Sequence, residues 1–209
     1  MIIFFGPAGS GKSTQGRAIA DKYGWRWLSV GQVLRDTGEF DEILEKGELV
    51  DDQEVVNLMN KQIDFARAEG MEIVLDGYPR DIEQANILLK ESKAGGRDFF
   101  GEIEAAIILS VPKEELLNRI QERGRSDDNM DVVERRFEIF EQNIYSILPL
   151  LKERNVPIHE VDGLGSFEQV TERITKIVQD VIPAPVVWKD DQAEAIENDA
   201  LEREKSYGE

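Results

Sequence analysis

Short apolar runs alternate with longer amphipathic stretches along most of the chain. Four of these runs have the length of strands, and each precedes a stretch in which apolar residues recur with helical spacing. They are Ile2–Phe5, Glu72–Leu75, Ala105–Val111 and Val156–Val161. A further short strand is predicted at Arg26–Ser29. Strands that alternate with helices are typical of a parallel sheet covered on both faces, so the pattern predicts an α/β fold.

Two longer polar stretches, residues 41–68 and 130–154, have the spacing of amphipathic helices. Pro149 is predicted to kink or end the second helix, because proline lacks the backbone N–H that the helix needs. The composition changes from residue 183 onward, where residues 183–209 carry eight acidic against three basic side chains. We predict one domain over residues 1–182, followed by an acidic tail.

The composition makes the chain strongly acidic. Its 209 residues include 25 Lys and Arg against 43 Asp and Glu, which gives a formal net charge of −18. A surface of this sign repels nucleic acids and anionic membranes, so neither is expected as a partner. With 41% apolar residues the chain can still bury a core, and we expect it to act as a monomer.

Residue types also limit the chemistry. The chain has no cysteine and one histidine, His159, which excludes disulfides, thiol nucleophiles and thiolate zinc sites and argues against a histidine-built metal centre. Any metal is therefore expected to be bound by oxygen atoms. The N-terminal residues lack the basic leader of a signal peptide, and no apolar run approaches the roughly 20 residues that span a bilayer. The expected compartment is the cytoplasm.

The most specific motif lies in residues 6–14. Their sequence, GPAGSGKST, satisfies the pattern G-x-x-x-x-G-K-[ST] and falls between a predicted strand and a predicted helix. Backbone N–H groups of such a loop surround phosphate oxygens, Lys12 can reach the outer phosphates, and Ser13 or Thr14 can address Mg²⁺ directly or through water. A chance glycine-rich turn is the alternative, and the flanking elements argue against it. The candidate nucleotide ligands are Gly9, Ser10, Gly11, Lys12, Ser13 and Thr14.

The loop by itself does not separate kinases, GTPases and ATPases. A GTPase is expected to carry the guanine-binding signature N-K-x-D. The nearest stretch, residues 60–63, reads NKQI and has isoleucine where the aspartate is required. We therefore discount a GTP-dependent switch.

A carboxylate and a group of arginines complete the candidate chemistry. Asp76 ends a predicted strand, at the same edge of the sheet as the phosphate loop. There it can hold Mg²⁺ or the water molecules of that ion. The alternative is that Asp76 caps a turn or a helix. Arg119, Arg123 and Arg125 are close in sequence, and Arg136 follows on the next predicted helix. Like charges at helical spacing repel each other unless an anion lies between them. The alternative is that these arginines lie on a solvent-exposed helix face and pair with nearby glutamates. In so acidic a chain, the group favours a phosphate clamp.

In order and spacing, these motifs resemble the adenylate kinase family of nucleoside monophosphate kinases over about residues 1–180. The likeness comprises the phosphate loop with Gln15, residues 29–35 (SVGQVLR), residues 48–50 (ELV), residues 76–80 (DGYPR) with Gln84, and residues 124–128 (GRSDD) with Arg136. The resemblance implies a P-loop NTPase-type core, in which a five-stranded parallel sheet has helices on both faces. It also implies a helical insert that binds the nucleoside monophosphate (NMP) near residues 30–60, and a short lid near residues 123–134.

The resemblance further implies a role for each matching residue. The loop amides and Lys12 are expected to hold the phosphates of ATP, with Arg119 against its base. Ser13 and Asp76 are expected to bind Mg²⁺, mainly through water. The residues expected to touch the NMP are Val30, Gly31, Arg35, Val50, Gly77, Arg80, Gln84, Arg125 and Arg136. Those expected to act on the transferred group are Lys12, Arg80, Arg123, Arg125 and Arg136, and Arg123 and Arg125 are also expected to contact the ATP phosphates.

The acceptor base leaves two substrate classes open. The Gln84 amide suits the edge of adenine, which favours AMP as the acceptor and ADP as the product. Val30 stands where adenylate kinases usually carry threonine, and Gln32 replaces an aspartate nearby, so UMP or CMP is the alternative acceptor. A third alternative is a nucleotide-binding module without activity that docks through its acidic tail. The retained lysine, aspartate and arginine set argues against it.

Overall fold

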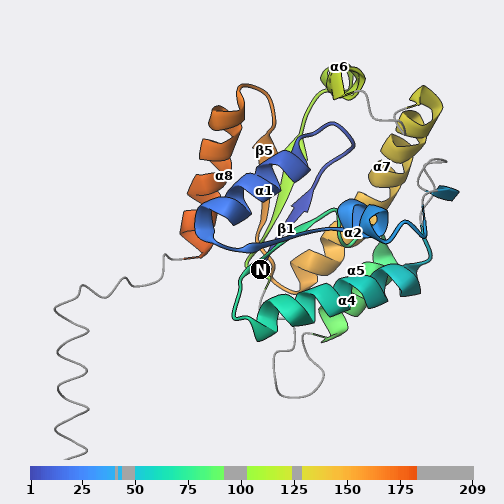
Figure 1. Cartoon of the computed structure of the whole chain (residues 1–209). Coiled ribbons are helices and arrows are strands. Elements are labelled where there is room, and N and C mark those ends of the chain that lie inside the picture. Colours follow the sequence, from blue (N-terminus) through green and yellow to red (C-terminus); the bar gives the residue numbers. More distant parts are fainter. Residues whose placement is uncertain (41, 44–49, 92–102, 124–128, 183–209) are drawn as a thin grey trace, which may run out of the picture.

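Five parallel strands form a single sheet in the computed structural model, which describes residues 1–40, 42–43, 50–91, 103–123 and 129–182 (Figure 1). In the sheet, β2 lies at one edge and β5 at the other, in the order β2-β3-β1-β4-β5. The strands are β1 (Ile2–Phe5), β2 (Arg26–Ser29), β3 (Ile73–Asp76), β4 (Ala105–Ser110) and β5 (Ile158–Asp162). All neighbouring pairs are parallel, which confirms the α/β fold expected from the sequence.

Helices connect the strands and cover both faces of the sheet. They are α1 (Lys12–Tyr23), α2 (Val30–Thr37), α4 (Asp52–Ala68), α5 (Ile82–Glu91), α6 (Lys113–Arg123), α7 (Met130–Glu153) and α8 (Phe167–Val181). Figure 1 shows α1 and α8 together on one side of the sheet, with α4 and α5 on the other. None of the helices in the described part of the chain is long and apolar enough to cross a membrane.

The central strand divides its side chains between two cores. Ile2 and Phe4 pack in the cluster that α1 and α8 complete, whereas Ile3 and Phe5 pack in the cluster that includes α4, α5 and α7. All four side chains are buried, because successive residues of a strand point to opposite faces and both faces are covered. This double burial explains why the inner strands β1, β3 and β4 are nearly continuous apolar runs, whereas the edge strands β2 and β5 also carry polar and charged residues.

Helix α7 continues through Pro149 and ends at Glu153, so the proline does not end the helix. Proline removes one intrahelical hydrogen bond, but Ile147 and Leu151 on either side of it are fully buried in the larger core. Packing of this kind supplies most of the stability of a helix in a folded protein, which explains the continuation.

Helix α4 begins later than the polar pattern suggested. The Asp51 side chain accepts hydrogen bonds from the backbone N–H groups of Gln53 (3.0 Å) and Glu54 (3.3 Å), so the helix starts at Asp52. Residues 44–49, most of the lid at 124–128 and the acidic tail at 183–209 lie outside the described residues. The division into core, insert, lid and tail therefore stays a prediction.

Parallel pairing places every β-to-α connection at one edge of the sheet, the edge at the carboxyl ends of the strands. The phosphate loop follows β1, Val30 follows β2, and Asp76 is the last residue of β3. Phe4 pairs with Asp76, which in turn pairs with Ser29, so these three connections start side by side. In open α/β sheets this edge is where ligands bind.

Candidate active site

The phosphate loop joins β1 to α1 in the strand-loop-helix context that its motif requires. Gly11 precedes α1 with a left-handed φ of 88°, and Gly9 also has a positive φ, of 79°. A Cβ on Gly9 would lie 2.8 Å from the backbone oxygen of Leu116, so the close approach of α6 leaves room only for glycine. Lys12 donates from Nζ to the Pro7 carbonyl at 3.2 Å, which holds its ammonium group over the loop.

Two glycines show which basic side chains meet at this edge. The position that a Cβ on Gly77 would occupy lies 3.8 Å from Lys12 Cε and 3.8 Å from an Arg80 Nη2 atom. The corresponding position on Gly31 lies 3.4 Å from Arg35 Nη1 and 3.6 Å from Arg80 Nη2. Arg80 therefore lies between Lys12 of the phosphate loop, which is predicted to bind ATP, and Arg35 of α2, which is predicted to bind the NMP.

The pKa of Arg80 is consistent with its position among like charges. Part of the residue is accessible to solvent, yet the protein around its guanidinium lowers the pKa of Arg80 by desolvation. Asp76 opposes this shift, whereas Arg136 and Arg35 add to it. Arg80 also donates from Nε to the Gly77 carbonyl at 3.0 Å, which fixes its orientation. Asp81 also opposes the shift, more weakly than Asp76, so three guanidinium groups lie near two carboxylates. The remaining excess of positive charge is one that a phosphate can neutralise.

Of the two carboxylates near Arg80, Asp76 has the larger effect on its pKa, and it is 1% exposed. Within the described part of the chain, neither of its carboxylate oxygens has a hydrogen-bond partner. A buried carboxylate in this state requires a cation or water, so Asp76 fits a role in holding Mg²⁺. Among the described residues, no group of three or more Asp, Glu, His or Cys side chains is placed to hold a metal ion without help from a ligand. Ser13 is half-buried in the first turn of α1, and Thr14 is exposed.

Gln84 is 1% exposed and connects α5 to α4. Its Oε1 accepts a hydrogen bond from the Arg80 N–H at 2.9 Å, and its Nε2 donates to Asp52 Oδ1 at 2.8 Å. The amide therefore has protein partners on both ends, and those partners orient it. Asp52 was not expected in the site. In the sequence, Asp52 stands out only because it directly follows another aspartate, Asp51.

Asp81 lies beside Asp52 at the start of α5. Its Oδ1 accepts from the N–H groups of Glu83 and Gln84, both at 2.9 Å, whereas its buried Oδ2 has no hydrogen-bond donor among the residues that the structure describes. Burial raises the pKa of Asp81 to about 6; the two N–H donors oppose that rise and the Asp52 carboxyl group adds to it. Sequence analysis missed this acid pair because its members are 29 positions apart.

Two other residues predicted to touch the NMP, Val30 and Val50, lie in the apolar core. Val30 and Val50 are 1% and 4% exposed and share one core cluster with Tyr78. Val30 offers no hydrogen bond to a base. Gln32 donates from Nε2 to Asp36 Oδ1 at 2.7 Å, so its amide is engaged within α2.

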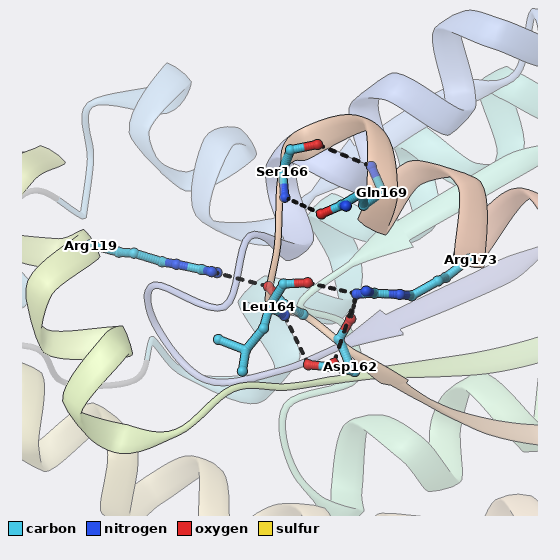
Figure 2. Close-up of polar contacts among 7 residues, drawn as sticks. Arg119, Asp162, Leu164, Ser166, Gln169 and Arg173 are labelled. Carbon is cyan, nitrogen blue, oxygen red and sulfur yellow. Dashed lines mark hydrogen bonds and ion pairs between the residues drawn. The ribbon is translucent and has the colours of Figure 1, made fainter.

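Arg119 of α6 stands apart from the Arg80 group. It donates from Nε to Glu115 Oε1 at 2.7 Å, as the alternative of local pairing with glutamates anticipated, and from Nη2 to the Gly163 carbonyl at 3.1 Å (Figure 2). Arg136, from α7, is half-buried and belongs to the Arg80 group. The described residues do not include Arg125 or the side chain of Arg123, so their predicted contacts stay predictions.

Gln15 of the phosphate-loop motif has a structural contact. It is buried, donates from Nε2 to the Phe167 carbonyl at 3.1 Å, and accepts from Thr171 Oγ1 at 2.8 Å. These bonds tie α1 to the first turn of α8. The glutamine therefore holds together the two helices that cover one face of the sheet.

Comparisons with known proteins agree with one another. The family model described as "Adenylate kinase" matches residues 4–156. A protein named adenylate kinase from Synechococcus sp. is 34% identical over 188 residues, which cover 85% of this chain and 97% of that relative. One of the same name from Thermus thermophilus is 35% identical over 185 residues, or 83% of this chain and 94% of the relative. A third, from a Nocardioides species, is 32% identical over 195 residues, or 87% and 98% of the two chains.

Proposed function

The chain belongs to the adenylate kinase family, and we propose that it transfers the γ-phosphoryl group of ATP to AMP, reversibly, to give two molecules of ADP. The observation that carries this proposal is the meeting of Lys12, Arg35 and Arg136 around Arg80, with Asp76 as the main opposing charge. A basic group of this density, at the carboxyl edge of a parallel sheet beside a phosphate loop, suits two phosphate chains that face each other.

The donor is held from the β1 side of the site. Backbone N–H groups of Gly9, Ser10, Gly11, Ser13 and Thr14 surround the phosphates of ATP, and Lys12 reaches the outer ones. Lys12 already leans toward Gly77 and Arg80, so its charge lies between the donor and the acceptor. The flat guanidinium of Arg119 provides the surface against which the donor base packs.

The acceptor is held from the α2 and β3 side. Arg35 and Arg80 grip the phosphate of the NMP, and Arg136 stabilises charge on the group in transit. The acceptor phosphate is already an oxyanion, so the reaction needs no general base and no covalent intermediate. Alignment of the two phosphates and neutralisation of their charge account for the catalysis.

Mg²⁺ is the cofactor that this chemistry favours. Bound to the donor phosphates, it would neutralise charge on the β- and γ-oxygens. Asp76 would hold it through water, since both carboxylate oxygens are buried and have no hydrogen-bond donor within the described part of the chain, and Ser13 lies at the start of the neighbouring helix.

The acceptor base is read by Gln84 in this proposal. Its Oε1 faces the Arg80 N–H and its Nε2 faces Asp52, so the direction of the amide is set before a nucleotide binds. An amide with a fixed direction pairs with a base edge that presents an amino group beside a ring nitrogen. Adenine has such an edge, and so does cytosine. Val30, which cannot donate a hydrogen bond, is the observation that keeps CMP as the second candidate acceptor.

A panel of acceptors tests the proposal. With ATP and Mg²⁺ supplied, production of ADP is measured in a coupled assay with AMP, CMP, UMP, dCMP or GMP as the acceptor. We expect AMP to give the highest kcat/KM. Faster turnover of CMP than of AMP would contradict the adenylate assignment, and ATP binding without any acceptor turnover would contradict kinase activity altogether.

A further inference from the structure

The connection between β5 and α8, residues 162–166, lies directly against the phosphate loop and is called the donor loop below. Gly163 donates its N–H to the Ser110 carbonyl at the end of β4, at 2.9 Å. A Cβ on Gly163 would lie 2.5 Å from Val111 Cγ2 and 3.5 Å from the backbone oxygen of Ser10. The donor loop is therefore pressed between β4 and the residues that hold the donor phosphates.

Arg119 depends on this loop for its orientation. Its Nη2 donates to the Gly163 carbonyl and its Nε to Glu115, and two bonds to different atoms of a planar group define the plane of that group. The Arg119 side chain is 26% exposed, so a ligand can still reach it. The position of the Gly163 carbonyl thus determines the orientation of the guanidinium plane of Arg119.

Arg173 of α8 holds the two carbonyls on either side of Gly163. Its Nη1 donates to the Asp162 carbonyl at 2.7 Å and to the Leu164 carbonyl at 2.6 Å. Because the carbonyls of residues 162 and 164 turn toward Arg173, the carbonyl between them turns away, toward Arg119. Figure 2 shows Arg119 and Arg173 approaching the loop from opposite sides, with the exposed Leu164 side chain on the Arg119 side.

Two features near the donor loop do not depend on Arg173. Asp162 Oδ1 accepts the Leu164 N–H at 2.9 Å, which closes the turn locally. Ser166 and Gln169 form a reciprocal capping box that starts α8. Loss of Arg173 would therefore free the carbonyls of Asp162 and Leu164, while the local turn and the cap of α8 remain.

We propose that Arg173 is a positioning residue for the donor base: by bracing the carbonyls of Asp162 and Leu164, it directs the Gly163 carbonyl at Arg119 and so sets the surface on which the base packs. The inference rests on the proposed function, which places that base against Arg119. It predicts an effect on nucleotides that carry a base and none on a phosphate chain alone.

Direct binding to the full-length chain tests this without any turnover. Calorimetric titration compares ATP with inorganic tripolyphosphate, which has phosphates but no base. For R173Q we expect affinity for ATP to fall about 3- to 10-fold, while affinity for tripolyphosphate changes less than about 2-fold. Lys176→Gln is the matched control, because it makes the same charge change on the same helix and its described ion pair is with the exposed Glu172, outside the donor loop.

A double-mutant cycle tests whether Arg173 acts through Arg119. In an Arg119→Ala background, R173Q should change ATP affinity less than about 2-fold, because the residue that it positions is gone. R173K should lie between the wild type and R173Q, since an ammonium group can reach the carbonyls without the geometry of the guanidinium fork. If R173Q does not fold, the same cycle with R173K decides the question.

Three results would overturn the inference. They are an unchanged ATP affinity in R173Q, an equal loss for tripolyphosphate, and losses from R119A and R173Q that simply add. A wild-type chain that binds ATP but phosphorylates no acceptor would reject the proposed function instead, and the binding comparison would still stand.

Discussion

On the proposed acceptor side of the site, the guanidinium groups of Arg35 and Arg136 act on that of Arg80, with Asp76 and, more weakly, Asp81 as the opposing charges. On the donor side, a neutral carbonyl and an exposed glutamate hold Arg119. The acceptor side keeps an excess of positive charge until an anion arrives, which suits it to grip a phosphate. On the donor side, Arg119 already has hydrogen-bond partners before any ligand binds, so it can present a preformed surface to a base.

The difference also explains how so acidic a chain could bind the two phosphate-bearing nucleotides of the proposed reaction. Its net charge of −18 describes the whole chain, whereas the acceptor side concentrates basic residues at one edge of the sheet. Coulomb forces between exposed charges fall off within about 10 Å in ordinary salt, so distant acidic residues do little to cancel this local excess. The acidity excludes a broad basic surface, and it does not exclude a small basic site.

The largest expected effect comes from breaking the acceptor side. Arg80→Ala removes the residue that joins Lys12 to Arg35, and it should lower kcat by about 1,000-fold, the scale of losing a transition-state arginine. ATP affinity should stay within about 3-fold of the wild type, because the phosphate loop is intact. Steady-state kinetics and ATP titration measure the two quantities, with Arg135→Ala on α7 as the control. Equal loss of both would show that Arg80 supports the fold rather than the acceptor.

The next effect tests how tightly the donor side is packed. In Gly163→Ala the added methyl group would lie 2.5 Å from Val111 Cγ2, and we expect a loss of about 1–3 kcal/mol of unfolding free energy with weaker ATP binding. Thermal unfolding with and without ATP measures both. Adding Val111→Ala removes the nearest atom, so the double variant should recover part of the ATP affinity. No recovery would place the clash elsewhere.

A smaller effect concerns the acid pair behind the acceptor side. The pKa of Asp81 is raised to about 6 in the folded chain from an ordinary 3.8, so the folded state binds more protons and stability falls as pH rises through that range. Asp81→Asn should abolish this fall, which we expect to be on the order of 1 kcal/mol or less because Asp81 is partly exposed.

Asp51→Asn is the matched control for this pH effect. It makes the same charge change, it lies next to Asp52, and asparagine preserves the cap of α4. Urea unfolding between pH 4 and pH 7 measures the difference for both variants. A wild-type stability that rises over this interval relative to D81N would contradict the raised pKa.

The smallest effect separates the two groups that hold Arg119. Glu115→Gln weakens an exposed ion pair at i,i+4 spacing, which is worth about 0.3–0.5 kcal/mol, so ATP affinity should change less than about 2-fold. The Gly163 carbonyl still orients the guanidinium in this variant. An effect as large as that of R173Q would show that the glutamate, rather than the donor loop, orients Arg119.

The sheet and the phosphate loop could be predicted because their signals are local. The inner strands are short apolar runs, and Ile2 to Phe5 are buried on both faces as such a run requires. The position of Asp76 at the end of β3 followed from the same pattern. Pro149 shows the limit of local rules, because burial of Ile147 and Leu151 outweighs the hydrogen bond that the proline removes.

The contacts that organise the site could not be predicted in this way. Asp52 meets Gln84 across 32 positions and Gln15 meets Phe167 across 152, and no periodic pattern connects such pairs. Arg173 is nine positions from Leu164, yet it binds that carbonyl only because the chain reverses direction between β5 and α8. In the sequence it is one more charged residue on an amphipathic helix.

By itself the sequence determined which elements form, where the phosphate loop lies and which charged side chains are available, because apolar periodicity and turn chemistry act over a few residues. Only the tertiary structure decided which of those side chains meet. The strand order β2-β3-β1-β4-β5 aligns the ends of separate strands at one edge and brings Lys12, Arg35 and Arg80 together there, while the packing of α6 and α8 against that edge places Arg119 and Arg173 on opposite sides of one loop.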